Sequence, residues 1–361
     1  MKEATWRDGK GSDAQMLVVD GARTVSRHVS DLANEVRAGD LVVLNDAATL
    51  PALLTGSTAS GEQVEARLAA HEQDGTFRAV LFGSGDTSMK TEDRGPAPRV
   101  KAGETLTFTI EPTAMSTPMS SVMTWAEVVH VDAAQPRLVS LRFHGAAEPA
   151  IFAVGKPVQY AYVSRPLSLF HVTPVFAAEP WAFEPASAGL TLDFATLSRV
   201  RAKGAELALI THAAGLSSLG DPSLDALLPF AELSRVTAET ADAVRRTKAR
   251  GGRVFAIGTT VVRALESASV PRPRVIEPRF GLTSLLVGEE RALGVVDVVL
   301  TGVHVPGESH HELLTAFQSR DVLAKACDHA ERDGYRSHEL GDTMLVFAHH
   351  LETRERLAHA S

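Results

Sequence analysis

The pattern of apolar and polar positions divides the chain into two kinds of segment. Between residues 57 and 150, short runs alternate apolar with polar residues, and Gly, Asp and Pro separate the runs. They are VEARLAAH, TFRAVLFG, ETLTFTIE, AEVVHVD and LVSLRFHG. A period of two indicates strands with one buried face, and this spacing is typical of a small antiparallel barrel or sandwich.

The flanking segments have the pattern of an α/β domain. Short, mostly apolar runs predict buried strands, and they alternate with runs of helical period. Strands are expected at Met16–Val19, Leu41–Leu44, LALITH, Val254–Ile257, SLLVG, VDVVLTGVHVP and TMLVFAHH, and helices near Val29–Val36, at 238–250, after Gly258 and from about Glu312. We therefore predict a mixed-sheet α/β domain, residues 1–56 and 151–361, with an inserted small antiparallel β-barrel domain, residues 57–150. The early strands should join the later sheet.

The run GGRVFAIGTTVVRALES, residues 251–267, has a strand followed directly by a helix. Gly258 ends the apolar part, and Val262, Leu265 and Ala268 follow at helical spacing. A glycine turn that opens a helix presents free N–H groups, and Thr259 and Thr260 add hydroxyls, so the turn suits a carboxylate or a phosphate. The alternative is that the threonines only cap the helix.

Composition narrows the class of protein. The 361 residues are 44% hydrophobic and 22% charged, which is typical of a globular protein large enough for two domains. No apolar run is long enough for a bilayer, the N-terminal segment lacks a signal-peptide core, and the single Cys327 excludes a disulfide framework. We expect a cytoplasmic protein, a monomer, with no membrane partner. The net charge of −8 argues against a uniformly basic surface, although residues 245–253 form either a local basic patch or the solvated end of a helix.

Several blocks of the sequence resemble the S-adenosylmethionine:tRNA ribosyltransferase-isomerase family of queuosine biosynthesis. The run at 251–267, followed by VVDVVLTGVHVP and GDTMLVF, is the most specific match. RAGDLVVLNDAATLPALLTG resembles the family's Asn-Asp turn and its surroundings, and EPASAGLTLDF resembles its Pro-Thr-Ala-Gly-Leu-His-Phe segment. The blocks follow the family's order over about residues 15–347.

The resemblance implies an enzyme that uses S-adenosylmethionine as a co-substrate, with no metal expected. Family members move the ribosyl carbons onto the aminomethyl group of 7-aminomethyl-7-deazaguanine in a tRNA anticodon. Epoxyqueuosine forms, and adenine and methionine leave. A sulfonium acidifies the neighbouring 5′ C–H, so a positioned base can start the loss of adenine, and the acceptor amine must attack in its neutral form. Such a site needs a carboxylate or histidine, a clamp for the methionine end, and protection from water.

The chain departs from the family motifs at several positions. The Asn-Asp-Thr-Arg turn is Asn45-Asp46-Ala47-Ala48, Gly-Leu-His-Phe is Gly189-Leu190-Thr191-Leu192, and Met-His-Ser-Glu corresponds to Pro229-Phe230-Ala231-Glu232. The missing guanidinium and imidazoles are groups that donate or titrate. Two rival functions therefore stay open. One is a paralogue that uses the same donor with a small-molecule acceptor or only cleaves it, and the other is a non-catalytic binder of RNA or of an adenine nucleoside.

Three residues are candidates for acid–base catalysis. Asp46 follows the strand Leu41–Leu44, at an edge where α/β sites form, or else makes an Asx turn leading to Pro51. His304 follows a strand and acts as a base or binds a ribose hydroxyl, or else bonds within its own loop. Glu232 is a second acid or base, or else a solvated loop carboxylate.

A further set is expected to bind the substrates. It consists of Asn45, Gly189, Thr211, Gly258, Thr259, Thr260, Arg263, Glu308, His310 and Asp342. Arg263 lies one turn into the helix and reaches the same anion as the threonines, or else pairs with Glu266. Asp342 positions the site or forms a turn.

His310, His311 and Glu312 are consecutive residues that invite a metal interpretation. Adjacent residues on a helix point about 100° apart, so they do not all face one ion. The family has Leu, Leu and Met at these positions. If this face lines the pocket, it makes an apolar wall polar and implies a changed acceptor; if it faces solvent, it has no such consequence.

Overall fold

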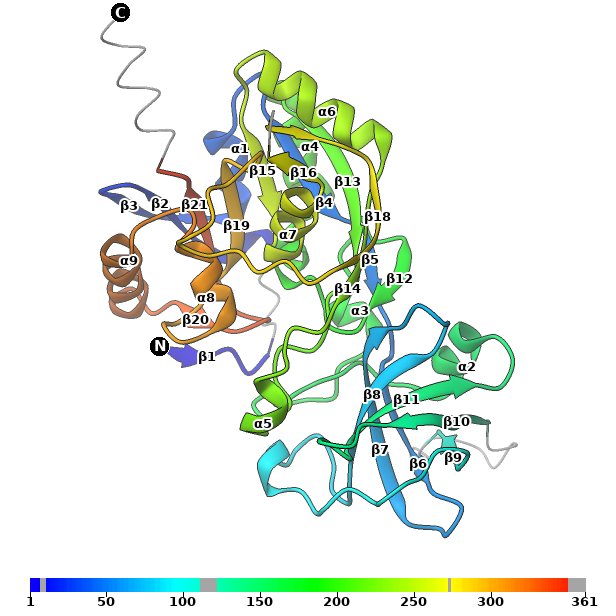
Figure 1. The fold of residues 1–361 in the computed structure, drawn as a ribbon. Coiled ribbons are helices and arrows are strands. Elements are labelled where there is room, and N and C mark those ends of the chain that lie inside the picture. The colour runs from blue at the N-terminus through cyan, green and yellow to red at the C-terminus, as the bar shows by residue number, and fades with distance from the viewer. Residues whose placement is uncertain (7–10, 111–121, 272–273, 350–361) are drawn as a thin grey trace, which may run out of the picture.

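The computed structural model describes residues 1–6, 11–110, 122–271 and 274–349. Within these residues the two large β structures are a nine-stranded mixed sheet and a closed, six-stranded antiparallel barrel (Figure 1). The predicted fold class is therefore confirmed.

The nine-stranded sheet contains strands from both ends of the chain. Its order is β18 (Arg279–Thr283), β14 (Glu232–Val236), β13 (Glu206–His212), β4 (Leu41–Asn45), β15 (Val254–Ile257), β19 (Val298–Gly302), β21 (Thr343–Phe347), β2 (Gln15–Asp20) and β3 (Arg23–His28). The strands β13, β4, β15 and β19 are parallel, so their carboxyl ends meet at one edge of the sheet, which we call the carboxyl edge. Since β14 is antiparallel to β13 and β21 is antiparallel to β19, both begin at this edge.

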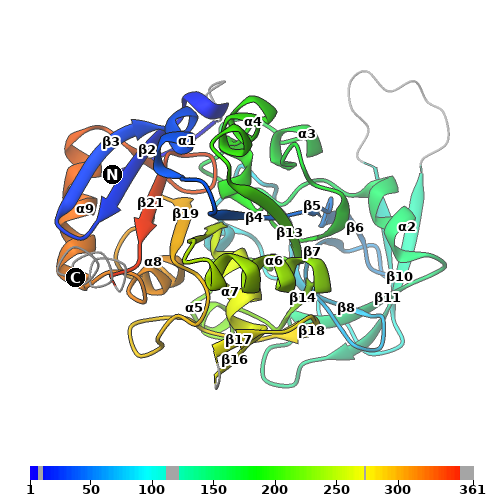
Figure 2. The same ribbon diagram turned by 90° about the horizontal axis from the view of Figure 1, so that it is seen from above.

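Helices cover both faces of the sheet. One apolar core lies between the sheet and α6, α7, α8 and α9, and another lies between the sheet and α1 and α4. Figure 2 shows α1 and α4 on one side of the central strands and α6, α7 and α8 on the other. The helices are α1 (Leu32–Glu35), α2 (Ala147–Val154), α3 (Leu169–Val172), α4 (Phe194–Ala202), α5 (Pro222–Asp225), α6 (Ala238–Ala249), α7 (Thr259–Ser267), α8 (Ser309–Leu314) and α9 (Arg320–Arg332).

The barrel begins directly after β4 and β5 and has its own apolar core. Its order is β10 (Met123–Val131), β11 (Leu138–Phe143), β8 (Phe77–Phe82), β7 (Gln63–His71), β6 (Leu53–Ser57) and β9 (Thr105–Thr109). Because the chain leaves β4 at the carboxyl edge, the barrel lies on that side of the sheet (Figure 1). The strand β6 starts before the expected boundary at residue 57; the domain limits themselves remain a prediction.

Shorter elements accompany these two structures. They are the paired strands β5 (Ala47–Thr49) with β12 (Glu179–Ala182), β1 (Lys2–Glu3) with β20 (Arg336–Ser337), and β16 (Ser269–Pro271) with β17 (Arg274–Ile276), and the 3-10 turns η1 (Gly11–Asp13), η2 (Val29–Asp31), η3 (Thr91–Asp93) and η4 (Ser187–Thr191). The prediction of a strand at SLLVG was wrong, because β18 ends at Thr283 and residues 284–288 have no regular structure.

Across the described ranges, none of the helices combines the length and the apolar character that crossing a bilayer requires.

Candidate active site

Five expected site residues come together at the carboxyl edge, and His212, which was not among those expected, joins them. Asn45 ends β4, His212 ends β13, Gly258 follows β15, His304 follows β19, Glu232 begins β14, and Asp342 precedes β21. The ends of parallel strands lie side by side, so residues far apart in the sequence meet here.

Asn45 ties three of these elements together. Its side-chain amide donates to the backbone oxygen of His212 at 2.9 Å and to Oγ1 of Thr260 at 3.2 Å. Its Oδ1 accepts from the backbone N–H of His212 at 2.9 Å and of Ala47 at 3.1 Å. The bond to Ala47 is the predicted Asx turn, and the others join β4 to β13 and α7. Asn45 is fully hydrogen-bonded and buried, so it holds the edge together.

A buried carboxylate with an arginine and a histidine forms what we call the Glu232 cluster: Glu232, His212, Gly215 and Arg263. Nε2 of His212 lies 2.8 Å from Oε2 of Glu232, which also pairs with Arg263, and Gly215 donates its N–H to Oε1 at 2.8 Å. Glu232 is only 7% exposed, so it is not a solvated loop carboxylate. Burial opposes its ionisation, but His212, Arg263 and Gly215 outweigh burial and lower the pKa of Glu232 to about 2.

Two buried nitrogen atoms in the Glu232 cluster lack partners among the described residues. Nη2 of Arg263 is buried and forms no hydrogen bond, and neither does Nδ1 of His212. The rest of the Arg263 guanidinium is held, since Nε donates to the backbone oxygen of Leu285 at 2.9 Å. Arg263 does not pair with Glu266, whose carboxylate instead accepts three backbone N–H groups from residues 294–296. A fixed guanidinium with one buried, unused N–H is suited to an anionic ligand.

The turn into α7 differs from the predicted threonine cap. The N-cap is Gly258, with φ of 100°, and no side chain caps the helix. Only glycine adopts this φ readily. A Cβ at this position would have room, because its nearest neighbour would be Oγ1 of Thr260 at 3.4 Å. The hydroxyl of Thr260 accepts from Asn45. The capping alternative is therefore wrong, and the first N–H groups of α7 lie at the carboxyl edge beside Asn45.

His304 and His310 form a second imidazole group at this edge. Nδ1 of His304 lies 3.3 Å from Glu308, Nε2 lies 3.0 Å from the Thr301 hydroxyl, and the ring centroids of the two histidines are 4.8 Å apart. Both nitrogens of His304 are therefore used within its own segment. Burial and the neighbouring His304 lower the pKa of His310 to about 4, and Glu232 and Arg263 are near enough to influence it. Burial alone would raise the pKa of Glu308, but the hydrogen bond with His304 outweighs burial and lowers it.

Asp46 belongs to a different group, the Asp46 cluster: Asp46, Thr211, Arg235 and Glu179. The Thr211 hydroxyl donates to Asp46 at 2.6 Å, and Nη2 of Arg235 donates to both Thr211, at 3.0 Å, and Glu179, at 2.8 Å. Burial raises the pKa of Asp46, and Thr211 and Arg235 only partly offset it. Asp46, Thr211 and Arg235 line a pocket of about 560 Å³ that follows β13 beside α6.

The two clusters lie on opposite faces of the sheet. Thr211 and His212 are neighbours in β13, and Glu232 and Arg235 are three residues apart in β14, so in each strand the two side chains point in opposite directions. The structure thus separates the expected catalytic residue Asp46 from Glu232.

Gly189 and Asp342 support the fold rather than point into the candidate site. A Cβ at Gly189 would lie 2.9 Å from the ring of Phe176, so the close packing of η4 requires glycine there. The carboxylate of Asp342 accepts from the backbone N–H of Gln15 at 3.0 Å and of Arg336 at 2.9 Å. Asp342 therefore joins the starts of β2 and β20 to the start of β21, and these bonds are not those of a local turn.

The three consecutive residues His310, His311 and Glu312 point in different directions. His310 is half-buried near the Glu232 cluster, His311 is buried with Nε2 unpartnered among the described residues, and Glu312 pairs with Arg320 on the surface. Only His310 faces the candidate site. Within residues 1–6, 11–110, 122–271 and 274–349, no three His, Cys, Asp or Glu side chains are placed to hold a metal ion.

Sequence reasoning missed three members of the site: His212, Arg235 and Glu179. His212 stands in the motif THAAGLSSL, one position from the family histidine, and this displacement was the available signal. Arg235 and Glu179 have no local signature, because only the pairing of β14 with β13 brings Arg235 to Thr211.

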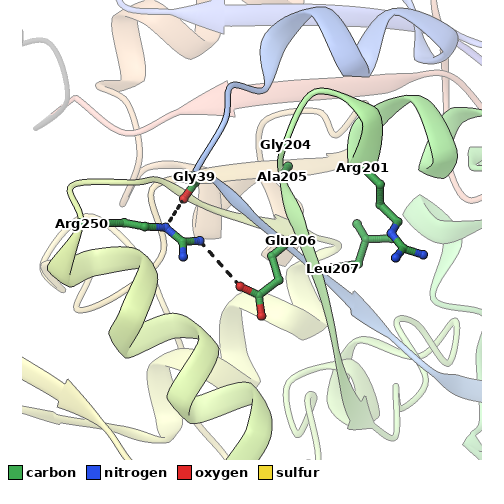
Figure 3. Close-up of a pocket in the computed structure, with 7 residues that line it drawn as sticks. All are labelled: Gly39, Arg201, Gly204, Ala205, Glu206, Leu207 and Arg250. Carbon is green, nitrogen blue, oxygen red and sulfur yellow. Dashed lines mark hydrogen bonds and ion pairs between the residues drawn. The ribbon is translucent and has the colours of Figure 1, made fainter.

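Another hollow is remote from this edge. It has a volume of about 780 Å³ and lies at the amino ends of β4 and β13. Figure 3 shows Arg250 bonded to the backbone of Gly39 and directed toward Glu206, with Arg201 on the far side. It contains none of the expected site residues.

The carboxyl edge gathers carboxylates, imidazoles and a guanidinium with one unpartnered nitrogen, and a barrel is inserted after β4. These features define an α/β enzyme with an inserted barrel. The model of a family described as queuosine biosynthesis protein matches residues 7–346. The chain belongs to this family, and the resemblance in the sequence motifs is confirmed.

Two relatives of more than 30% identity agree with this assignment. An S-adenosylmethionine:tRNA ribosyltransferase-isomerase from Thermus thermophilus is 32% identical over 328 residues, which are 90% of this chain and 89% of the relative. A protein of the same name from Azoarcus sp. is 31% identical over 347 residues, 93% and 91% of the two chains. A crystal structure of an S-adenosylmethionine tRNA ribosyltransferase from Thermotoga maritima is 21% identical, with a TM-score of 0.48, and the match covers 96% of this chain and 95% of that one.

Proposed function

We propose that this chain is an S-adenosylmethionine:tRNA ribosyltransferase-isomerase. It transfers and isomerises the ribosyl moiety of S-adenosylmethionine onto 7-aminomethyl-7-deazaguanine in tRNA, which gives epoxyqueuosine and releases adenine and methionine. The observation that carries the proposal is the family match over residues 7–346, a range that includes every residue of the candidate site.

Arg263 is the proposed clamp for the carboxylate of the donor's methionine end. Its buried, unpartnered Nη2 and the N–H groups that open α7 at Thr259 and Thr260 supply donors for an anion. Glu232 holds Arg263 in place. Because the pKa of Glu232 is about 2, it is a weak base near neutral pH, and we assign it to positioning rather than to proton transfer.

Asp46 is the proposed base. Its raised pKa makes it a stronger base than an ordinary aspartate, and it lines a pocket large enough for a ligand group. Thr211 and Arg235 hold its carboxylate in one orientation. His310, whose ring forms no hydrogen bond within the described ranges, is the proposed contact for a ribose hydroxyl. His304, fixed by Glu308 and Thr301, lies against the His310 ring and is assigned to positioning it.

The first experiment is a product analysis with the purified protein. S-adenosylmethionine is incubated with and without tRNA that carries 7-aminomethyl-7-deazaguanine, and adenine, methionine and the mass of the tRNA nucleosides are followed by mass spectrometry. Adenine release that requires this tRNA, together with epoxyqueuosine, supports the proposal. Release without tRNA would favour another acceptor or simple cleavage of the donor. No release, with the donor or RNA still bound, would favour a non-catalytic binder.

A further inference from the structure

Two aromatic side chains lie exposed beside the Asp46 cluster. Phe280, on the edge strand β18, is 69% exposed, and its ring centroid lies 6.2 Å from that of the half-buried Trp181 on β12. The rings meet at 62° and leave apolar surface open to solvent. Isolated exposed rings are common, but a pair of rings beside a candidate catalytic carboxylate is a candidate contact surface.

Arginines accompany these rings. The guanidinium of Arg235 lies 5.0 Å from the ring of Trp181, and that of Arg78 lies 5.3 Å from the ring of Phe230 across the neighbouring pocket of about 390 Å³. Arg235 pairs with Glu179 and Arg78 with Glu72, whereas Arg279, next to Phe280, forms no ion pair within the part of the chain that the structure describes. Aromatic rings interleaved with arginines are the composition that binds single-stranded nucleic acid, because bases stack on the rings and phosphates pair with the cations.

The position of these rings connects them to the chemistry. Phe280 pairs with Arg235 across β18 and β14, and Thr283, three residues on, pairs with Glu232. Paired residues point to the same face of a sheet, so Phe280 lies on the face of the Asp46 cluster. Three residues of a strand span about 10 Å, so the rings lie within reach of a nucleotide whose neighbour occupies the carboxyl edge. Through Arg235 and Thr211, they also connect to Asp46 by consecutive hydrogen bonds.

The backbone of β18 argues against the other common occupant of an exposed edge, an added peptide strand. β18 is an edge strand of only five residues, Arg279–Thr283, so it offers few backbone groups to an added peptide. Arg279 adds an exposed charge to the edge.

We propose that Phe280 and Trp181 form a stacking platform for unpaired bases of the tRNA substrate, with Arg279 and Arg78 contacting its phosphates. This inference rests on the proposed function and adds to it the surface that presents the RNA to the site. Residues from the sheet edge and from the barrel contribute to the surface, so it requires both parts of the fold.

The test compares the variant Phe280→Ala with two controls. Phe280→Tyr keeps the ring, and Phe194→Ala removes a ring of nearly equal exposure, 66%, at the start of α4. The Kd for tRNA is measured by fluorescence anisotropy, and the KM for tRNA is measured by adenine release. Phe280→Ala should weaken tRNA binding roughly 5- to 100-fold and raise KM with kcat retained, because one base loses its stacking partner. Phe280→Tyr and Phe194→Ala should behave as the wild type.

Arg279→Gln gives an independent readout. Loss of one phosphate contact should lower the slope of log affinity against log salt concentration by about one, without a change in the binding of S-adenosylmethionine.

The outcomes separate the two proposals. Wild-type protein that binds and modifies tRNA while Phe280→Ala binds it equally well would overturn the platform and leave the proposed function standing. Wild-type protein that neither binds tRNA nor responds to it would overturn both. If Phe280→Ala instead converts a dimer to a monomer in size-exclusion chromatography and leaves tRNA binding unchanged, the edge joins copies of this chain and the platform is wrong.

Discussion

The Asp46 cluster and the Glu232 cluster contain similar groups at the same sheet edge, yet the pKa values of Asp46 and Glu232 are shifted in opposite directions. Each contains a carboxylate, an arginine and one of two neighbouring residues of β13. Burial raises the pKa of Asp46, and little offsets it. Among the described residues, the Thr211 hydroxyl is the one side-chain group that donates a hydrogen bond to Asp46, while Arg235 donates to that hydroxyl and to Glu179. Glu232 is also buried, but an arginine, a histidine and a backbone N–H contact it directly and lower its pKa to about 2.

The comparison shows how one strand end supplies two different chemistries. Direct ion pairing makes a carboxylate a fixed anion that positions its partners, and burial without such pairing makes it a base. The alternation of side chains along β13 sends Thr211 to one group and His212 to the other. The predictions that follow test this difference.

The largest expected effect is that of Asp46→Asn. Removal of the base should lower kcat about 100- to 10,000-fold and leave the Kd for S-adenosylmethionine nearly unchanged. Because the folded-state pKa is raised, the ionised carboxylate opposes folding above that pKa, so the variant should be as stable as the wild type or more stable near neutral pH. Single-turnover adenine release, calorimetry and urea unfolding measure these quantities. An equal loss of binding and turnover would contradict the assignment of a base.

The second effect is on stability in acid. Glu232 has a folded-state pKa of about 2 against an ordinary value of 4.5, so its contribution is complete above pH 4.5 and is lost as the pH falls toward 2. The loss amounts to at most about 3 kcal/mol. Glu232→Gln should flatten this part of the stability curve, measured by denaturant unfolding at a series of pH values, whereas Asp46→Asn should not. A curve that Glu232→Gln leaves unchanged would exclude the ion-paired state.

The third effect is on donor binding. Arg263→Ala should weaken binding of S-adenosylmethionine about 10- to 100-fold, because a charge-assisted hydrogen bond to the carboxylate is lost. Arg263→Lys keeps the charge but not the planar fork and should recover only part of the affinity. Arg320→Ala, at an exposed arginine, is the matched control. Isothermal titration calorimetry measures all three; unchanged affinity in Arg263→Ala would exclude the clamp.

The smallest effect is expected for Thr211→Val. This variant removes the Thr211 hydroxyl, which donates a hydrogen bond to Asp46. That hydrogen bond lowers the pKa of the Asp46 carboxyl, so its loss should raise the pKa. The acidic limb of the kcat profile should therefore move to higher pH, with a loss in rate of about threefold to tenfold that corresponds to roughly 1 kcal/mol. A lower rate with no movement of the limb would indicate a purely structural role for Thr211.

The sequence pattern predicted the fold better than it predicted the site. Alternating runs located the barrel strands, and the blocks around Asn45, Gly258 and His304 lie together at one edge of the sheet. The strand predicted at SLLVG failed because an apolar run without a strand partner gives the same local signal as a strand. The threonine cap failed because Gly258 occupies the N-cap position, so Thr259 and Thr260 lie inside the first turn of α7.

The sequence by itself determined the elements, their alternation and the family, since periodicity and motif spacing are properties of neighbouring residues. The tertiary structure decided which groups act together. Glu232 meets His212 across 20 positions and Arg263 across 31, while Asp46 meets Thr211 across 165. These partners set opposite pKa shifts on two carboxylates, and no local pattern contains them, because charge and burial act through space and depend on how strands pair.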